Sequence, residues 1–231
     1  ANEKIRFACV GIGGMGGKGV NVASGEQIIA AADVDTKHAA GAIKKIQGKF
    51  PDAKIYTDYR KLFDEQKNLD AVWVATPDHH HFPATVRALE AGCSVYCEKP
   101  LCHDLYEARK LRDLAKAKNV ATQMGNQGHS GEHVRLLVEW IWQGVLGDVT
   151  EAHVRPPYNQ MDFGSRDPGK VASVPENLNW DLWQGINKER EYRTGIVPAK
   201  WRGWLDYGTG LLGDWFRSEE HTSELQSHHP I

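Results

Sequence analysis

The sequence predicts an α/β fold: an N-terminal Rossmann domain with a doubly wound parallel sheet, followed by an incomplete second α/β domain. Short apolar runs alternate with helical patterns through the first 125 residues, and a glycine-rich turn follows the first run. After Gln127 the pattern gives way to loop-rich sequence. Continuous apolar runs are typical of strands buried on both faces. Their alternation with helices indicates right-handed βαβ units.

Six segments have the character of buried strands, and Lys54–Tyr56 is the weakest of them. In chain order they are Ile5–Val10, Gln27–Ala32, Lys54–Tyr56, Ala71–Ala75, Ser94–Cys97 and Val120–Met124. Helical patterns separate them over residues 36–48, 82–91 and 105–118. Asp104 precedes the last helix and Glu107 follows three residues later, which is the spacing of a capping box.

The second half of the chain has fewer periodic signals. We expect a helix over 132–142 and a strand over 148–154. Residues 155–198 are rich in Pro, Gly, Asn and Asp, and a loop this long is unusual within one compact domain. We therefore divide the chain into a first domain over 1–125, a partial second domain over 126–216 and a tail over 217–231.

The composition is that of a globular protein and excludes several partners. Hydrophobic residues make up 41% and charged residues 25% of the 231 residues, so a packed core is expected. The net charge of −2 gives no electrostatic hold on nucleic acid or anionic lipid, and no apolar run approaches the ~20 residues of a membrane span. The four cysteines lack disulfide-scaffold or zinc spacing. Cytoplasmic location and export after removal of a leader both stay open.

A glycine-rich turn follows the first predicted strand. Gly11, Ile12, Gly13, Gly14, Met15 and Gly16 fit the pattern G-x-G-x-x-G. Gly11 permits the tight turn, Gly13 lets a pyrophosphate approach the backbone, and Gly16 lets the next helix pack closely. The helix N-terminus would offer N–H groups and a positive dipole end to phosphates. The pattern in this context predicts dinucleotide binding.

Asp33 follows the second predicted strand, 22 residues after Gly11. An acid at this point is expected to hold the ribose hydroxyls of the adenosine. Its charge would repel a 2′-phosphate, and the next three residues supply no arginine to bind one. We therefore expect NAD rather than NADP.

Two further motifs complete a family pattern. Thr76-Pro77-Asp78-His79-His80-His81 follows the fourth predicted strand, and Glu98-Lys99-Pro100 follows the fifth. With the glycine loop, these motifs make the chain resemble the Gfo/Idh/MocA oxidoreductases over essentially residues 4–214. The family includes relatives of glucose–fructose oxidoreductase and inositol dehydrogenase. The resemblance implies that the second domain is a substrate domain with a large open sheet.

The resemblance also implies residue roles. Lys99 matches the catalytic lysine and Asp214 the catalytic aspartate of the second domain. The positions expected at the cofactor, besides the glycine loop and Asp33, are Thr76, Pro77, His81, Glu98 and Gln127. Candidate contacts of a sugar or polyol substrate are Lys99, Asn126, Arg202 and Tyr207. The Lys99–Pro100 bond is expected to be cis. The full-length form is expected to be a homo-oligomer through the second-domain sheet.

The lysine fits the chemistry of alcohol oxidation. The reaction needs a base for the hydroxyl proton while a hydride leaves to NAD. Burial and a positive nicotinamide ring both disfavour the ammonium form of a lysine, which makes it a better base. His79, His80 and His81 are successive residues on a turn and would not converge on one ion, so no metal is expected. Trp180, Trp183, Trp201 and Trp204 could stack on sugar rings or pack a core.

The end of the chain departs from the family. Relatives carry a catalytic histidine four residues past the aspartate, and that position is Ser218 here. Residues 217–228 have no apolar periodicity and resemble a translated sequencing adapter. We expect the tail to be a read-through artefact and the chain to be a truncated, inactive fragment.

Three functions stay open from the sequence. The first is an NAD-dependent dehydrogenase of a sugar or polyol. The second is a redox-neutral, NAD-dependent glycoside hydrolase, which would oxidise a ring hydroxyl transiently. The third is a non-catalytic NAD-binding protein.

Overall fold

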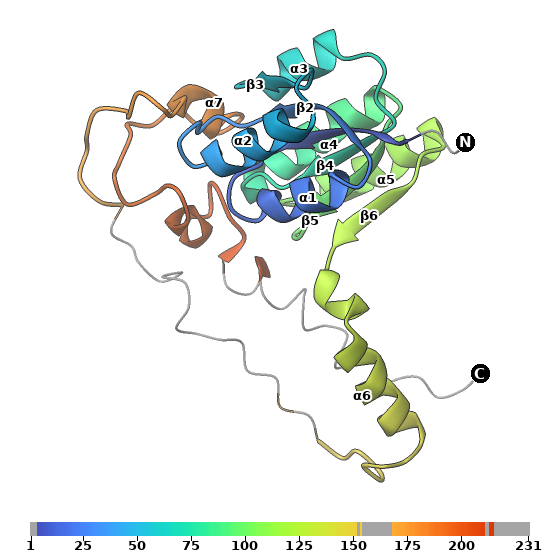
Figure 1. Ribbon diagram of the computed structural model, residues 1–231. Coiled ribbons are helices and arrows are strands. Elements are labelled where there is room, and N and C mark those ends of the chain that lie inside the picture. Colours follow the sequence, from blue (N-terminus) through green and yellow to red (C-terminus); the bar gives the residue numbers. More distant parts are fainter. Residues whose placement is uncertain (1–3, 152, 154–167, 211–212, 215–231) are drawn as a thin grey trace.

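The computed structural model describes residues 4–151, 153, 168–210 and 213–214, and its centre is one six-stranded parallel sheet (Figure 1). The strand order is β3-β2-β1-β4-β5-β6. The strands β1 to β3 extend the sheet to one side and β4 to β6 extend it to the other. The switch point therefore lies between β1 and β4, which is where open α/β sheets bind ligands. The Rossmann fold class expected from the sequence is confirmed.

All six predicted strands are present, with ends shifted by a residue or two. They are β1 Arg6–Val10, β2 Gln27–Ala32, β3 Lys54–Tyr56, β4 Ala71–Val74, β5 Ser94–Glu98 and β6 Thr122–Gly125. The helices of this part are α1 Gly16–Ala23, α2 Ala40–Lys49, α3 Tyr59–Glu65, α4 His81–Glu90 and α5 Leu105–Lys118. Of these, α3 was not predicted, because it spans only seven residues and has little room for periodicity.

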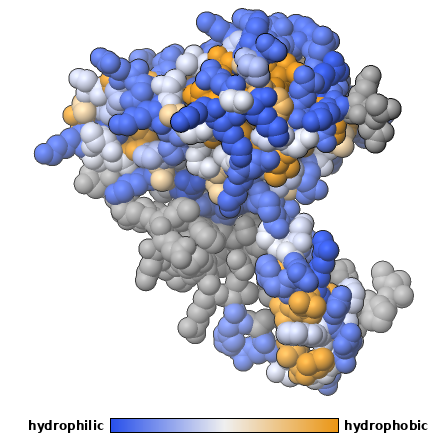
Figure 2. Space-filling view, in the orientation of Figure 1, coloured by the Kyte–Doolittle hydropathy of each residue, from blue (hydrophilic) through white to orange (hydrophobic). Residues whose placement is uncertain are grey.

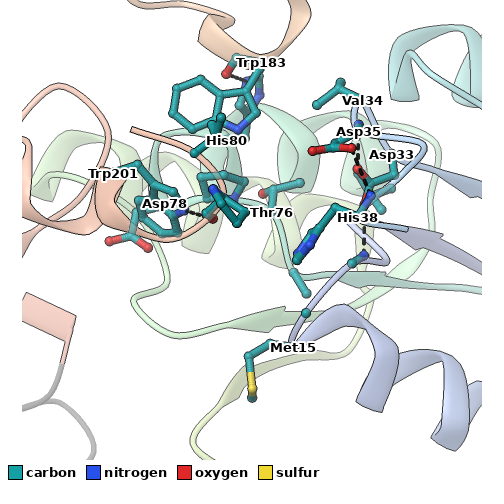
Figure 3. Close-up of a pocket in the computed structure, with 18 of the residues that line it drawn as sticks. Met15, Asp33, Val34, Asp35, His38, Thr76, Asp78, His80, Trp183 and Trp201 are labelled. Atoms are coloured by element: carbon teal, nitrogen blue, oxygen red, sulfur yellow. Dashed lines mark hydrogen bonds between the residues drawn. The ribbon is translucent and has the colours of Figure 1, made fainter. Parts of the chain in front are cut away.

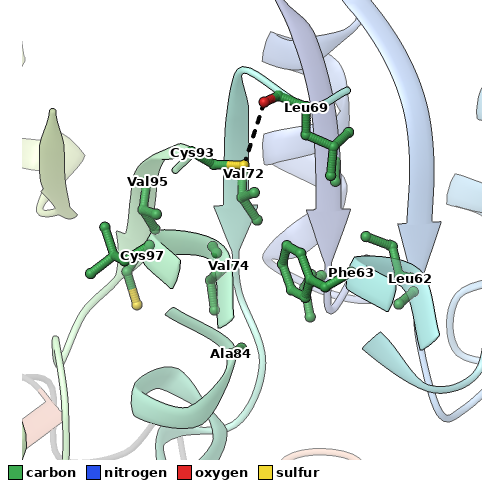
Figure 4. Packing of buried hydrophobic residues seen from close by; sticks show 14 of the residues in the cluster. Leu62, Phe63, Leu69, Val72, Val74, Ala84, Cys93, Val95 and Cys97 are labelled. Atoms are coloured by element: carbon green, nitrogen blue, oxygen red, sulfur yellow. Dashed lines mark hydrogen bonds between the residues drawn. The ribbon is translucent and has the colours of Figure 1, made fainter. Parts of the chain in front are cut away.

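Helices cover both faces of the sheet and bury a core on each. On one face, α1 and α2 pack their Val20 and Ile46 against Cys9, Ala31 and Trp73 of the strands. On the other face, α3, α4 and α5 pack against β4 and β5, as the side chains around Val72 and Val74 show (Figure 4). The central strands β1, β4 and β5 are largely buried because helices cover both faces of the parallel sheet, whereas the edge strands β3 and β6 are more exposed.

The capping box before α5 is formed, with one change in its partners. The Asp104 carboxylate accepts from the backbone N–H of Glu107 at 2.9 Å, as predicted. The Glu107 carboxylate accepts from the N–H of His103, one residue before the cap, at 2.7 Å. α2 begins at Ala40, four residues later than predicted, because Thr36–Ala39 form turns instead of the first helical turn.

The helix α6, Glu132–Trp142, agrees with the prediction but stands away from the sheet (Figure 1). None of its residues is buried, and Leu136, Leu137 and Trp140 are exposed. Hydrophobic surface is visible on this projecting part (Figure 2). The predicted strand over 148–154 is wrong where it can be judged: residues 148–151 and 153 are exposed and not in a strand. Residues 152 and 154 and the predicted tail over 217–231, Ser218 included, lie outside the described residues.

Residues 168–210, here called the strap, return to the carboxyl edge of the sheet. The strap contains α7 Trp180–Gln184, the 3₁₀ segment Lys200–Gly203 and two isolated antiparallel bridges, Val171 with Arg193 and Leu178 with Asp35; the rest is turns and irregular chain. Backbone bonds join it to the loop after β2: Thr36 N–H donates to Asn177 O, and Asn179 N–H donates to Val34 O. The expected second-domain sheet does not occur among the described residues. None of the helices described here has the length and apolar character needed to span a membrane.

Candidate functional site

A cavity of about 490 Å³ lies at the carboxyl edge of the sheet, between the first domain and the strap (Figure 3). Twelve of the sequence-predicted site residues line it: Gly11, Gly13, Gly14, Met15, Asp33, Thr76, Pro77, His81, Glu98, Lys99, Arg202 and Asp214. Ile12, Gly16, Asn126, Gln127 and Tyr207 do not line it. The strap adds a wall that the sequence did not predict, with Leu178, Leu182 and Trp183 among its members.

The glycine loop is packed too tightly to carry side chains at two positions. A Cβ on Gly11, whose φ is +75°, would lie 2.7 Å from Ala75 O at the end of β4. A Cβ on Gly16 would lie 1.8 Å from Gly11 O. Gly11 therefore permits the turn, and Gly16 permits the close approach of α1, as the sequence predicted.

The N–H groups of this loop are unequally available to an anion. Gly16, Gly17 and Lys18 donate to Gly13 O, Gly14 O and Met15 O at 2.9 to 3.1 Å. The N–H groups of Gly14 and Met15 have no partner among the described residues. A pyrophosphate at the start of α1 could therefore bind the N–H groups of Gly14 and Met15. The sequence had predicted only that the N–H groups of this helix terminus would bind it.

Asp33 is held in place by the loop it faces. Its Oδ2 accepts from the N–H groups of Ile12 and Gly13, and its Oδ1 accepts from Asp35 N–H, all at 2.9 Å. Burial raises the pKa of Asp33, and these three N–H groups oppose the rise. A carboxylate has about four acceptor positions. The one that stays open, on Oδ1, allows a single further hydrogen bond from a ribose hydroxyl.

His38 is a neighbour of this loop that sequence reasoning missed. Its backbone N–H donates to Asp35 Oδ1, and its ring lies against Gly13, where an added Cβ would clash with the ring. Figure 3 shows the ring on the same side of the cavity as Asp33 and opposite Trp201. No sequence signal distinguishes His38 from an ordinary surface histidine, because the close approach depends on how the loop after β2 folds.

Lys99 and Asp214 meet at the other end of the cavity, although 115 residues separate them. Lys99 Nζ donates to Asp214 Oδ1 at 2.7 Å and to Asp214 O at 2.6 Å. The Asp214 side chain is 5% exposed, and Arg202 Nε lies 3.6 Å from its Oδ2. The Lys99–Pro100 bond is cis, as expected. The structure thus brings both predicted catalytic residues into one ion pair.

Glu98 is bonded to Gln127, one of the two amide candidates beyond β6. Gln127 Nε2 donates to Glu98 Oε1 at 2.5 Å. Burial raises the pKa of Glu98, and the Gln127 amide opposes the rise. Gln127 is exposed and Asn126 is half-buried, and neither reaches the cavity. Gln127 is therefore connected to the cavity through Glu98, which lines it.

The strap is anchored to the first domain by two histidines and a cluster of aromatic rings. His79 Nε2 and His80 Nε2 lie 2.8 and 3.0 Å from Trp183 O. Trp183 and Tyr207 pack against each other and against His79, with ring centroids 4.8 to 5.2 Å apart. Burial lowers the pKa of His79 to about 3 and that of His80 to about 4. Both rings are therefore neutral parts of the packing.

Tyr207 and three of the four tryptophans of the strap are core residues. Tyr207 is 1% exposed, which corrects the expectation that it contacts substrate. Trp180, Trp183 and Trp201 are 7%, 5% and 4% exposed and pack in one cluster. Together with Leu178, Ile196 and Tyr207, these rings form the small hydrophobic core of the strap. Among the described residues no three metal-ligating side chains converge.

A turn of glycines at the switch point of a parallel sheet, an acid after β2 and a lysine–aspartate pair at the sheet edge define a dinucleotide-binding α/β protein. The chain matches "Oxidoreductase family, NAD-binding Rossmann fold" over residues 5–126 and the same family's "C-terminal alpha/beta domain" over 151–219. The protein belongs to the Gfo/Idh/MocA oxidoreductase family.

Individual relatives are enzymes of sugars and polyols. D-xylose 1-dehydrogenase (NADP⁺) of Hypocrea jecorina is 43% identical over 95 residues, covering 41% of this chain and 24% of that protein. Inositol 2-dehydrogenase/D-chiro-inositol 3-dehydrogenase of Lacticaseibacillus casei is 27% identical over 161 residues, covering 66% and 45%.

A solved structure shares the fold. The WlbA dehydrogenase of Thermus thermophilus, in complex with NAD and alpha-ketoglutarate, superimposes with a TM-score of 0.54 at 22% identity, covering 60% of this chain and 47% of that one. This chain spans less than half the length of each of these three relatives.

Proposed function

We propose that the protein is an NAD-dependent oxidoreductase that transfers a hydride between a sugar or polyol hydroxyl and the nicotinamide. The observation that carries the proposal is the Lys99–Asp214 pair at the end of a cavity that begins at the glycine loop. The named relatives, a xylose and an inositol dehydrogenase, support the substrate class.

The first domain fits NAD at three points along the cavity. Asp33 Oδ1 keeps one acceptor position for an adenosine ribose hydroxyl, and its charge disfavours the 2′-phosphate of NADP. Gly14 and Met15 keep N–H donors for the pyrophosphate. The Thr76 hydroxyl is buried and has no partner among the described residues, so it is a donor or acceptor for the nicotinamide end. When bound, NAD supplies the acceptor of the hydride.

The chain's own residues handle the proton. Lys99 Nζ, in its neutral form, accepts the proton of the substrate hydroxyl. At the same time a hydride passes from the carbon that bears this hydroxyl to the nicotinamide. Asp214 Oδ1 then holds the resulting ammonium at the distance seen here, 2.7 Å. Arg202, whose guanidinium carbon lies 4.3 Å from the centre of the Trp201 ring, approaches the second Asp214 oxygen and fixes the carboxylate from its other side. In reduction the same proton returns from Lys99 to the alkoxide.

The relatives that carry the activity match this chain over less than half of their own length, so the activity proposed here is that of the whole protein. An oligomer formed through the second-domain sheet remains part of the proposal for the whole protein.

Two assays on the purified chain test the proposal. The first is calorimetric titration with NAD and with NADP, in which NAD is expected to bind more tightly. The second is a screen of pentoses, hexoses and inositols for NADH formation, with a chain extended by a relative's second domain run in parallel. NADH formation by the extended protein supports the dehydrogenase. Cleavage of a glycoside without NADH release would replace it with the redox-neutral hydrolase, and absence of NAD binding would refute both.

A further inference from the structure

His81 makes an unusual pair of contacts beneath the site. It is the first residue of α4 and only 1% exposed. Its Nδ1 lies 2.5 Å from the carbonyl oxygen of Pro100, in the turn that carries Lys99. Its Nε2 lies 2.8 Å from the carbonyl oxygen of Thr76, at the end of β4. One side chain thus joins two turns that both line the cavity.

The chemistry of these contacts fixes the proton count of the ring. A carbonyl oxygen only accepts hydrogen bonds, and a neutral imidazole has one donor and one acceptor nitrogen. A neutral His81 would aim a lone pair at a carbonyl lone pair at 2.5 or 2.8 Å. Only the imidazolium, with a proton on each nitrogen, donates to both oxygens.

The surroundings compensate this charge. Burial by itself favours a neutral ring, but the Cys97 sulfur, the Asp78 carboxylate and the Pro100 carbonyl oppose it and raise the pKa of His81 to about 10. The Glu98 carboxylate faces the ring from β5 as well. The two other titratable neighbours, His79 and His80, are neutral because burial lowers the pKa of each.

His79 provides the contrast within the same turn. Both of its ring nitrogens also lie near carbonyl oxygens, but the Nδ1 contact with Tyr207 O is long, at 3.2 Å. That oxygen already accepts from the backbone N–H of His79 at 3.3 Å. His79 therefore needs only one ring proton, on Nε2, whereas the two short contacts of His81 need two.

We propose that His81 is a positioning residue, held permanently as an imidazolium, which ties the Thr76 turn to the Lys99–Pro100 turn and so fixes the lysine at the reactive end of the cavity. It is not itself a cofactor contact, because both of its polar atoms are used by the protein. The part of this inference that concerns Lys99 rests on the proposed function. The protonation and the tie between the two turns do not.

The protonation is tested by nuclear magnetic resonance of the intact chain labelled with ¹⁵N-histidine. The signals of His81 are identified by their loss in His81→Gln, and those of His79 by their loss in His79→Gln. Between pH 6 and 8 we expect both nitrogens of His81 to carry a proton and only one nitrogen of His79 to do so. A single protonated nitrogen on His81 at pH 7 would overturn the proposal.

The positioning is tested with His81→Gln and the control His103→Gln, which alters an exposed histidine that also contacts a carbonyl oxygen, that of Gly208. Glutamine at 81 has both of its N–H donors on a single nitrogen, whereas the imidazolium has them on two nitrogens that face different carbonyl oxygens. The glutamine is therefore expected to keep only one of the two contacts. We expect NAD to bind about tenfold more weakly to His81→Gln, and the ammonium signal of Lys99 to shift, with no such change in the control. Reduced thermal stability with unchanged Lys99 signal and unchanged NAD affinity would show a merely structural histidine. Neither readout uses turnover, so failure of the dehydrogenase proposal would not affect them.

Discussion

The two walls of the cavity are built in different ways. The first is the edge of a six-stranded sheet, whose backbone hydrogen bonds hold it and whose two cores support it from both faces. The second is the strap, with one five-residue helix, whose order depends on side chains that bond to backbone groups. Trp180 Nε1 donates to Arg190 O, and Asn187 Nδ2 donates to Asp206 O. A sheet wall distributes its stability over many bonds, whereas the strap concentrates it in a few side chains.

The largest expected effect is at the sheet wall, where backbone packs on backbone. Gly16→Ala would place a Cβ 1.8 Å from Gly11 O, which only a shift of the turn can relieve. We expect a loss of about 4 kcal/mol or more in unfolding free energy and no measurable NAD binding. The control is Gly17→Ala, one residue further along α1, whose Cβ would approach nothing closer than 3.9 Å. Denaturant unfolding measures the unfolding free energy of both variants. Equal values for Gly16→Ala and Gly17→Ala would contradict the expectation that the close contact at Gly16 matters.

The strap should depend on single aromatic residues. Trp183 is 5% exposed and its carbonyl oxygen faces His79 and His80. Truncating a buried aromatic side chain to Ala costs about 3–5 kcal/mol. We expect Trp183→Ala to release the strap while the sheet stays folded, seen as new proteolytic cleavage within 168–210 with unchanged far-ultraviolet circular dichroism. Leu205→Ala, at a side chain that is 81% exposed, is the control. Simultaneous loss of both parts would show that they are one cooperative unit.

Acid should act on the strap through His79 and His80. Their pKa values, about 3 and about 4, lie below the unfolded value of ~6.5, so below pH ~6.5 the unfolded chain binds more protons than the folded one. The contribution of these two histidines to the unfolding free energy is therefore full above pH ~6.5 and falls toward pH ~4. Over this range the unfolded chain binds about two protons more than the folded chain, and this number sets the slope. His81 acts in the opposite sense: with its pKa raised to about 10, its contribution is full below pH ~6.5 and is lost as the pH rises through 10.

Tryptophan fluorescence during urea unfolding at pH 7, 6 and 5 measures this slope. The double variant His79→Gln/His80→Gln keeps donors for Trp183 O without groups that titrate in this range, and its slope should be smaller by about two protons. The same pH dependence in the variant and the parent would show that other groups cause the acid sensitivity.

The smallest expected effect is a weaker affinity for NAD when Asp33 is changed. Asp33→Ala removes the carboxylate that faces the adenosine ribose and that also orders the Ile12 and Gly13 N–H groups. Charged hydrogen bonds contribute about 1.5–3 kcal/mol, so NAD should bind ten- to a hundredfold more weakly, with less discrimination against NADP. Asp33→Asn keeps an acceptor without the charge and should recover part of the affinity. Calorimetry showing parental NAD affinity in Asp33→Ala would remove Asp33 from the site.

The sheet wall could be predicted from the sequence and most of the strap could not, for a physical reason. A buried parallel strand is mostly apolar, so β4, Ala71–Val74, and the middle of β5, Ser94–Glu98, are visible as apolar runs. The strap has no period: that Trp183 packs against His79 is set by how two distant loops meet. Asp214 was found only through the family resemblance, and its distance to Lys99 could not have been derived from the spacing of the two residues in the sequence. The same limit explains why His38 was missed and why Tyr207 was assigned to the substrate.

The most direct test of the account is a crystal structure of the chain with NAD bound. The account predicts one ribose hydroxyl on Asp33 Oδ1, the pyrophosphate on the N–H groups of Gly14 and Met15, and the nicotinamide ring beside Lys99 Nζ and Asp214. A nicotinamide placed away from the Lys99–Asp214 pair, or an adenosine that does not contact Asp33, would contradict it.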